Sequence, residues 1–229
     1  MSKVLFIITS HGELPGSDST TGVWLGEFTE PYYLFKDAGF EVDLASPNGG
    51  QPPVDDTSKL TEHITGSNRK FNDDPELQHK FANTLKLENL NTSDYDAVFF
   101  PGGHGPIWDL ASDTKVADLI LKFDSEKKTI GAVCHGSAAF ISAAKKNPEF
   151  IRGKRISCFS NMEEKLSGKE KYMPYLLEDA LQGLGAEIDN TKIPYTSNTT
   201  TDDNLITGQN PMSSGGVAKL MIEVINSKI

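Results

Sequence analysis

The stretch Thr129-Ile130-Gly131-Ala132-Val133-Cys134-His135-Gly136-Ser137 decides the fold class of this chain. Its first five residues are a short, β-prone apolar run, which is typical of a strand covered on both faces of a parallel sheet. The cysteine follows at once, and a helical pattern begins three residues later. A buried strand that leads through a tight turn into a helix is one half of a βαβ unit.

Other apolar runs predict the rest of such a sheet. Strands are expected at residues 4–8, 41–45, 97–100, 156–159 and 205–207. Helices are expected at residues 24–35, 115–123, 137–145, 174–184 and 217–225. Strands that alternate with helices build parallel sheets with helices on both faces. The fold class is therefore α/β and flavodoxin-like, with a parallel-rich sheet sandwiched between helices.

The length of 229 residues favours one domain with an insertion. The insertion, at about residues 51–94, is polar and rich in Asn and Asp, with a weak helical signal at 76–85. We expect part of it to form a small cap over the pocket. His63 and His79 lie within it and are expected to be solvated.

The composition of the chain argues against two classes of binding partner, nucleic acids and membranes. The 32 acidic residues outnumber the 22 basic ones, and the formal charge of −10 argues against nucleic acid as the main partner. No run approaches the roughly 18 apolar residues that span a bilayer, so no membrane partner is expected. Two cysteines in a chain of this size fit a reducing compartment, which predicts a cytoplasmic location.

Cys134 is the first candidate for chemistry. Small residues surround it, as in the strand–turn–helix segment that exposes the serine of the G-x-S-x-G hydrolases. A thiol at a helix N-terminus meets the positive end of the helix dipole, which favours the thiolate. The alternative is a small buried thiol that only packs.

The loop after residues 97–100 is the second candidate. Pro101-Gly102-Gly103-His104-Gly105 offers backbone N–H groups without side chains in the way, which suits an oxyanion hole or a substrate wall. A glycine-rich tight turn is the alternative. The sequence contains no G-x-G-x-x-G after the first strand and no Walker A motif, so no nucleotide cofactor is predicted. No spacing of residues predicts a metal site.

Acid and base partners for the thiol are few. No histidine follows His135, so the base is His135 itself, at an irregular turn, or an upstream histidine. Glu163 and Glu164 follow residues 156–159 and would reach the same sheet edge, unless they only cap a helix. Glu27 lies one turn into the first helix, and an apolar pocket would raise its pKa.

Together these residues resemble the ThiJ/PfpI superfamily, which has the class I glutamine-amidotransferase-like fold. The stretches that carry the resemblance are Thr21–Glu27, Ala38–Val42, Pro101–Gly105, Ala132–Gly136 and Leu205–Pro211. The resemblance implies Cys134 as nucleophile, His135 as its partner and Glu27 as acid/base. It implies Glu164 as the triad acid, with Glu163 adjacent, and an oxyanion hole from the backbone N–H groups of Gly103 and His135.

Within the superfamily the chain is similar to the heat-shock protein thirty-one, or glyoxalase III, group. That implies a cofactor-independent, glutathione-independent lyase that converts methylglyoxal and similar 2-oxoaldehydes to 2-hydroxy acids. It also implies a homodimer and a stress-protective role, with deglycase and chaperone activities reported in the group. A cysteine hydrolase or peptidase, and a redox-sensing holdase chaperone, are the alternatives.

Overall fold

A seven-stranded sheet forms the centre of the computed structural model, which describes residues 2–227. Its order is β3-β2-β1-β4-β5-β9-β8, and every neighbouring pair is parallel except β8 and β9. The strands are β1 (Lys3–Ile7), β2 (Glu41–Ser46), β3 (Leu85–Lys86), β4 (Ala97–Phe100), β5 (Thr129–Val133), β8 (Thr199–Asp202) and β9 (Leu205–Gly208). The predicted parallel-rich α/β fold is confirmed.

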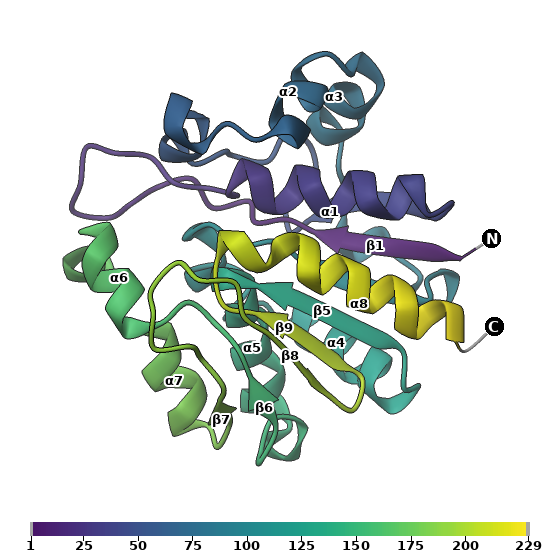
Figure 1. The fold of residues 1–229 in the computed structure, drawn as a ribbon. Helices are drawn as coiled ribbons and strands as arrows, with labels where there is room; N and C mark the ends of the chain where they lie inside the picture. The colour runs from purple at the N-terminus through teal and green to yellow at the C-terminus, as the bar shows by residue number, and fades with distance from the viewer. Residues whose placement is uncertain (1, 228–229) are drawn as a thin grey trace.

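Helices cover both faces of this sheet, as Figure 1 shows. On one face α1 (Leu25–Asp37) packs beside α8 (Ser214–Ser227), and on the other α4 (Thr114–Ser125) packs beside α5 (Ala139–Lys146). The side chain of Phe6 on β1 meets Phe28 and Phe35 of α1 edge to face, with ring centroids 6.3 and 5.8 Å apart. Such aromatic contacts between strand and helix fix α1 against the sheet.

The insertion contains two short helices, α2 (Gly66–Asn72) and α3 (Pro75–Ala82), followed by the edge strand β3 and two 3-10 turns, Leu87–Asn89 and Thr92–Asp94. α2 contacts α1, so the insertion lies over one side of the sheet rather than apart from it. The weak signal at 76–85 therefore corresponds to α3 followed by a strand. The prediction of a single domain is not tested by these contacts and stays a prediction.

One predicted strand is wrong. Residues 156–159 do not join the main sheet: β6 (Arg155–Ile156) pairs instead with β7 (Glu187–Ile188) in a separate two-stranded sheet. Beyond β6 the backbone N–H groups donate to side chains, Ser157 to Thr207 Oγ1 and Cys158 to Asn190 Oδ1. The antiparallel strand β8 takes the edge position beside β9, which the sequence pattern did not indicate.

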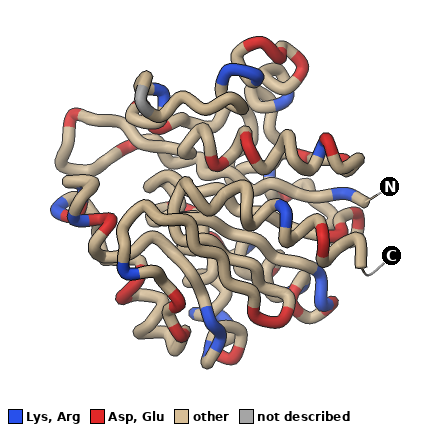
Figure 2. Tube along the Cα trace, in the orientation of Figure 1, with Lys and Arg blue, Asp and Glu red and all other residues tan. Residues whose placement is uncertain are grey.

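Two helices complete the same region, α6 (Asn161–Ser167) and α7 (Leu177–Gly183). The sequence predicted α7, as part of 174–184, and offered α6 only as the alternative in which Glu163 and Glu164 cap a helix. Charged residues of both signs are spread over the outer helices and loops, and Figure 2 shows no continuous basic face in this view.

The turn after β5 depends on one glycine. A Cβ on Gly136 would lie 2.1 Å from the carbonyl oxygen of Phe100, a backbone atom of the neighbouring strand-end loop. The segment Cys134–Ala138 is a tight 3-10 turn that leads into α5. The close approach of these two backbones brings the ends of β4 and β5 together.

We predict that Gly136→Ala destabilises the protein by about 1–3 kcal/mol, because overpacking against backbone cannot be relieved by a side-chain rotation. The measurement is urea unfolding followed by circular dichroism. Gly183→Ala is the matched control: a Cβ there meets nothing within 4 Å and the residue is the last of helix α7, so its unfolding free energy should stay the same or rise by up to about 1 kcal/mol. Equal effects of the two substitutions would contradict the packing argument.

Candidate active site

Cys134 lies at the end of β5 in a left-handed backbone conformation, with φ of 57°. Such a conformation is strained for a residue with a Cβ and is concentrated at functional sites. The side chain is buried, with 4% of its surface exposed. Burial and the neighbouring Glu27 raise the pKa of the thiol well above its ordinary value. The sequence predicted that the helix dipole favours the thiolate, but burial and Glu27 act in the opposite direction and favour the thiol.

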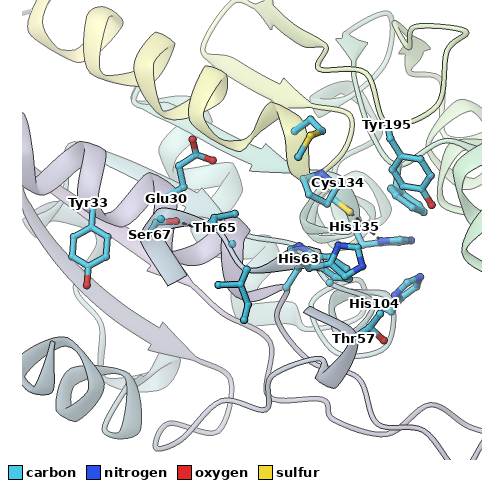
Figure 3. Close-up of a pocket in the computed structure, with 18 of the residues that line it drawn as sticks. Glu30, Tyr33, Thr57, His63, Thr65, Ser67, His104, Cys134, His135 and Tyr195 are labelled. Atoms are coloured by element: carbon cyan, nitrogen blue, oxygen red, sulfur yellow. Dashed lines mark hydrogen bonds between the residues drawn. The ribbon is translucent and has the colours of Figure 1, made fainter. Parts of the chain in front are cut away.

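His135 and Glu164 complete a line of side chains from the thiol, and Figure 3 shows the first two members, Cys134 and His135. His135 Nδ1 lies 3.4 Å from Cys134 Sγ, and its Nε2 lies 2.6 Å from Glu164 Oε2. Two consecutive residues can meet in this way because the turn at Cys134 is irregular. Burial alone would raise the pKa of Glu164, but the two histidines beside it hold that pKa below its ordinary value. An ionised Glu164 orients His135 with its Nδ1 lone pair toward the sulfur.

Glu163 has a different set of contacts from its neighbour. It forms a capping box with Ser160 at the start of α6 and accepts hydrogen bonds from Tyr195 N and Asn210 Nδ2, both at 2.8 Å. Within the described residues it makes no hydrogen bond to His104 or His135. Of the two glutamates that the sequence left open, Glu164 is the one beside the histidine.

Glu27 is fully buried in the first turn of α1 and faces the same thiol. Its Oε2 accepts a hydrogen bond of 2.8 Å from Gly102 N, while no described residue makes a hydrogen bond to its Oε1. Burial raises the pKa of this carboxyl from 4.5 to about 8, although a side-chain hydrogen bond with Cys134 opposes the shift. Near neutral pH, Glu27 can therefore gain and lose a proton easily.

The glycine loop brings Glu27 and Cys134 together. A Cβ on Gly102 would lie 2.6 Å from Glu27 Oε2 and 2.9 Å from Cys134 Cβ, so no larger residue fits between them. The sequence predicted that the N–H groups of this loop bind an oxyanion. The Gly102 N–H instead donates its hydrogen bond to Glu27. Gly103 follows with φ of 88°, and its N–H donates no hydrogen bond to a described residue.

His104 occupies the other side of Glu164. Its Nε2 lies 2.9 Å from Glu164 Oε1, and its ring centroid is 4.2 Å from that of His135. Burial lowers the pKa of His104 to about 4, so the neutral ring donates its Nε2–H to the carboxylate. His104 Nδ1 lies 4.0 Å from Asp55 Oδ2, which is paired with Lys169 Nζ at 2.9 Å. His104, which the sequence placed in an oxyanion hole or a substrate wall, thus contacts Glu164.

These groups open onto a cavity of about 960 Å³. Cys134, His135, His104 and Gly103 line it at one end, and the outer face of α1, with Glu30 and Tyr33, lines the rest. The insertion supplies one wall through Thr57 and residues 63–67. His63 belongs to that wall and meets the Trp24 ring edge to face at 5.0 Å, so the expectation that it is simply solvated is wrong.

Within the described residues, one cluster has side chains of the kind that bind metal ions. It consists of His104, His135 and Glu164, whose ligand atoms lie within 4.8 Å of one another. Two ligands with 2.0–2.1 Å bonds around a tetrahedral ion stand about 3.3 Å apart. The N–O distances here, 2.6 and 2.9 Å, are instead those of hydrogen bonds. In this arrangement the three side chains form a hydrogen-bonded network.

Sequence comparison identifies the family to which this site belongs. Residues 19–224 match the DJ-1/PfpI family. The chain belongs to the DJ-1/PfpI family. The matched residues include Glu27, Glu164, the glycine loop and the turn at Cys134, so the whole candidate site lies within the matched region.

Two relatives that match nearly the whole chain have the names of enzymes, and a third protein is similar in its solved structure. Glyoxalase 3 of Candida albicans is 29% identical over 97% of this chain and 98% of its own. A protein/nucleic acid deglycase, HchA of Pseudomonas aeruginosa, is also 29% identical, over 97% of this chain and 80% of its own. The solved structure of Rapid Encystment Protein 24 kDa from Francisella tularensis superposes with a TM-score of 0.93 and 35% identity, over 98% of this chain and 99% of its own.

Between residues 2 and 227, no helix has both the length and the apolar character that crossing a bilayer requires.

The raised pKa of Glu27 predicts a pH-dependent stability. The folded pKa of about 8 exceeds the unfolded value of 4.5, so between these values the native state binds more protons and stability falls as pH rises. From pH 5 to 7.5 we expect wild type to lose about 2–3 kcal/mol of unfolding free energy more than Glu27→Gln does. Urea unfolding at several pH values measures this difference.

Glu41→Gln is the matched control, because Glu41 is exposed on β2 and its substitution should leave the pH dependence of wild type intact. Parallel stability–pH curves for wild type and Glu27→Gln would contradict a protonated, buried Glu27.

Proposed function

We propose that the protein is a glutathione-independent glyoxalase that converts methylglyoxal and similar 2-oxoaldehydes to 2-hydroxy acids. The observation that carries this proposal is a buried thiol in contact with two different proton-transfer groups. One is His135, oriented by Glu164, and the other is Glu27, whose pKa is about 8. The names of the relatives support the same activity. The reaction is an internal redox, since the aldehyde carbon is oxidised and the ketone carbon is reduced.

In the first step the sulfur of Cys134 attacks the aldehyde carbon. Because the thiol pKa is raised, its proton must leave during attack, and His135 Nδ1, at 3.4 Å, is in reach to accept it. The aldehyde oxygen becomes a hydroxyl when His135 returns that proton. The product is a hemithioacetal on Cys134, and the enzyme thiol takes the part that a glutathione thiol would otherwise play.

In the second step Glu27 moves a proton along the substrate. As a carboxylate it removes the proton from C1, the electron pair forms a C1–C2 double bond, and the ketone oxygen takes up a proton from water. This enediol then accepts the proton from Glu27 at C2, and the C1 hydroxyl gives its proton to the hydroxide left by that water, so that C1 becomes a thioester carbonyl and no net proton is gained or lost. A carboxyl with a pKa close to the working pH suits both halves of this transfer.

Hydrolysis completes the cycle. His135 takes a proton from water as the water oxygen attacks the thioester carbon, and the developing oxyanion lies toward the N–H groups of Gly103 and His135. Collapse of the tetrahedral intermediate breaks the C–S bond, and the proton from His135 restores the thiol. The products are lactate, when methylglyoxal is the substrate, and the free enzyme.

A deglycase activity would use the same steps on a 2-oxoaldehyde adduct. The cavity of about 960 Å³ is much larger than methylglyoxal, and the relative from Pseudomonas aeruginosa is named a deglycase. A hydrolase or peptidase would need the thiol, His135 and Glu164 but has less use for Glu27. The homodimer, the cytoplasmic location and the chaperone role implied by the resemblance remain predictions.

We predict that the wild-type protein forms lactate from methylglyoxal without glutathione, and that Cys134→Ala and Glu27→Gln each lower the rate at least about 100-fold. The measurement follows loss of methylglyoxal and appearance of lactate. Cys158→Ala is the matched control, because Cys158 is the other buried cysteine and does not line the cavity. Wild-type turnover that survives Cys134→Ala, or no turnover at all, would overturn the proposal.

A further inference from the structure

Tyr195 shares an unusual backbone conformation with the nucleophile. Among described residues other than glycine, Lys127, Cys134, Tyr195 and Asp203 have positive φ, with Tyr195 at 56°. Lys127, Tyr195 and Asp203 all lie in exposed turns, but of these three it is Tyr195 that lines the cavity, as the buried Cys134 does. Strain of this kind persists only where surrounding contacts hold it, and it concentrates at functional sites.

The contacts that hold Tyr195 come from Glu163. The buried carboxylate of Glu163 accepts the Tyr195 N–H at 2.8 Å, and Asn210 Nδ2 donates to the same oxygen at 2.8 Å. Asn210 Nδ2 also donates to the carbonyl of Thr196, at 2.8 Å. Glu163 itself is fixed by its capping box at the start of α6. These bonds tie the loop that carries Tyr195 to both α6 and the segment before α8.

The ring of Tyr195 stands at the mouth of the cavity. Its centroid lies 6.3 Å from that of Phe159, which in turn lies 4.5 Å from the His135 ring. Figure 3 shows the Tyr195 side chain beside Cys134 and His135, on the opposite side from His63. Because 44% of its surface is exposed, the ring forms part of the rim rather than of the core.

We propose that Tyr195 is a specificity-determining residue whose fixed ring limits the size of the group that reaches Cys134. This inference rests on the proposed 2-oxoaldehyde activity for its substrate class, but the steric role is a property of the cavity alone. A mobile ring could rotate away from a bulky group. A ring on a backbone held by a buried carboxylate has less freedom to do so, and it therefore favours an alkyl over an aryl substituent on the ketone carbon.

Tyr195→Gly tests the wall without straining the fold, because glycine adopts φ of 56° freely. For this variant the ratio of kcat/KM for methylglyoxal to that for phenylglyoxal should fall about tenfold. Tyr195→Phe keeps the ring and should leave the ratio unchanged. Asp203→Gly is the matched control, since it relieves the same backbone conformation, φ of 54°, away from the cavity. An unchanged ratio in Tyr195→Gly would overturn the proposal.

A second measurement separates this inference from the proposed function. Alkylation of Cys134 is followed by peptide mass spectrometry with iodoacetamide and with the bulkier N-phenylmaleimide. In Tyr195→Gly the rate with N-phenylmaleimide should rise about tenfold, and clearly more than the rate with iodoacetamide. That result would support the proposal that the Tyr195 ring limits access to Cys134, even if neither aldehyde turned over. Equal changes for the two reagents would contradict it.

Discussion

The burial of Glu27 against Cys134 is the constraint on which the rest of the site depends. Burial strongly disfavours the ionised form of a carboxyl, and it raises the pKa of Glu27 to about 8. The two groups can be this close only because Gly102 has no side chain and directs its N–H at the carboxyl. The strained turn at Cys134 and the tight packing at Gly136 then place the sulfur in front of that carboxyl.

Much of this could be predicted from the sequence, because the rule for parallel sheets is geometric. Strand ends from one sheet meet at one edge, so the loops after β4 and β5 had to lie together whatever their details. The first turn of α1 follows β1, which pairs with β4, and this explains why Glu27 was a sound candidate. Gly102 and Gly136 lie where two backbones approach closely, and a glycine in a loop after a strand indicates such an approach from the sequence alone.

The rest depends on tertiary contacts that no local pattern encodes. Glu163 and Glu164 are adjacent, and only the helix capping at Ser160 turns one toward Tyr195 and the other toward His135. His63 and Tyr195 lie in polar stretches whose path over the cavity is set by distant partners. The pKa of Cys134 was misjudged for the same reason, since burial and a neighbouring carboxyl are not local properties.

The central claim is that Cys134 and Glu27 perform successive steps on one substrate. Mass spectrometry of intact Glu27→Gln protein incubated with methylglyoxal tests it most directly, with Cys134→Ala as the reference. The account predicts an adduct of one methylglyoxal on Cys134 that accumulates in Glu27→Gln, with no lactate formed. Absence of the adduct under conditions in which wild type turns over, or lactate released by Glu27→Gln at the wild-type rate, would contradict the account.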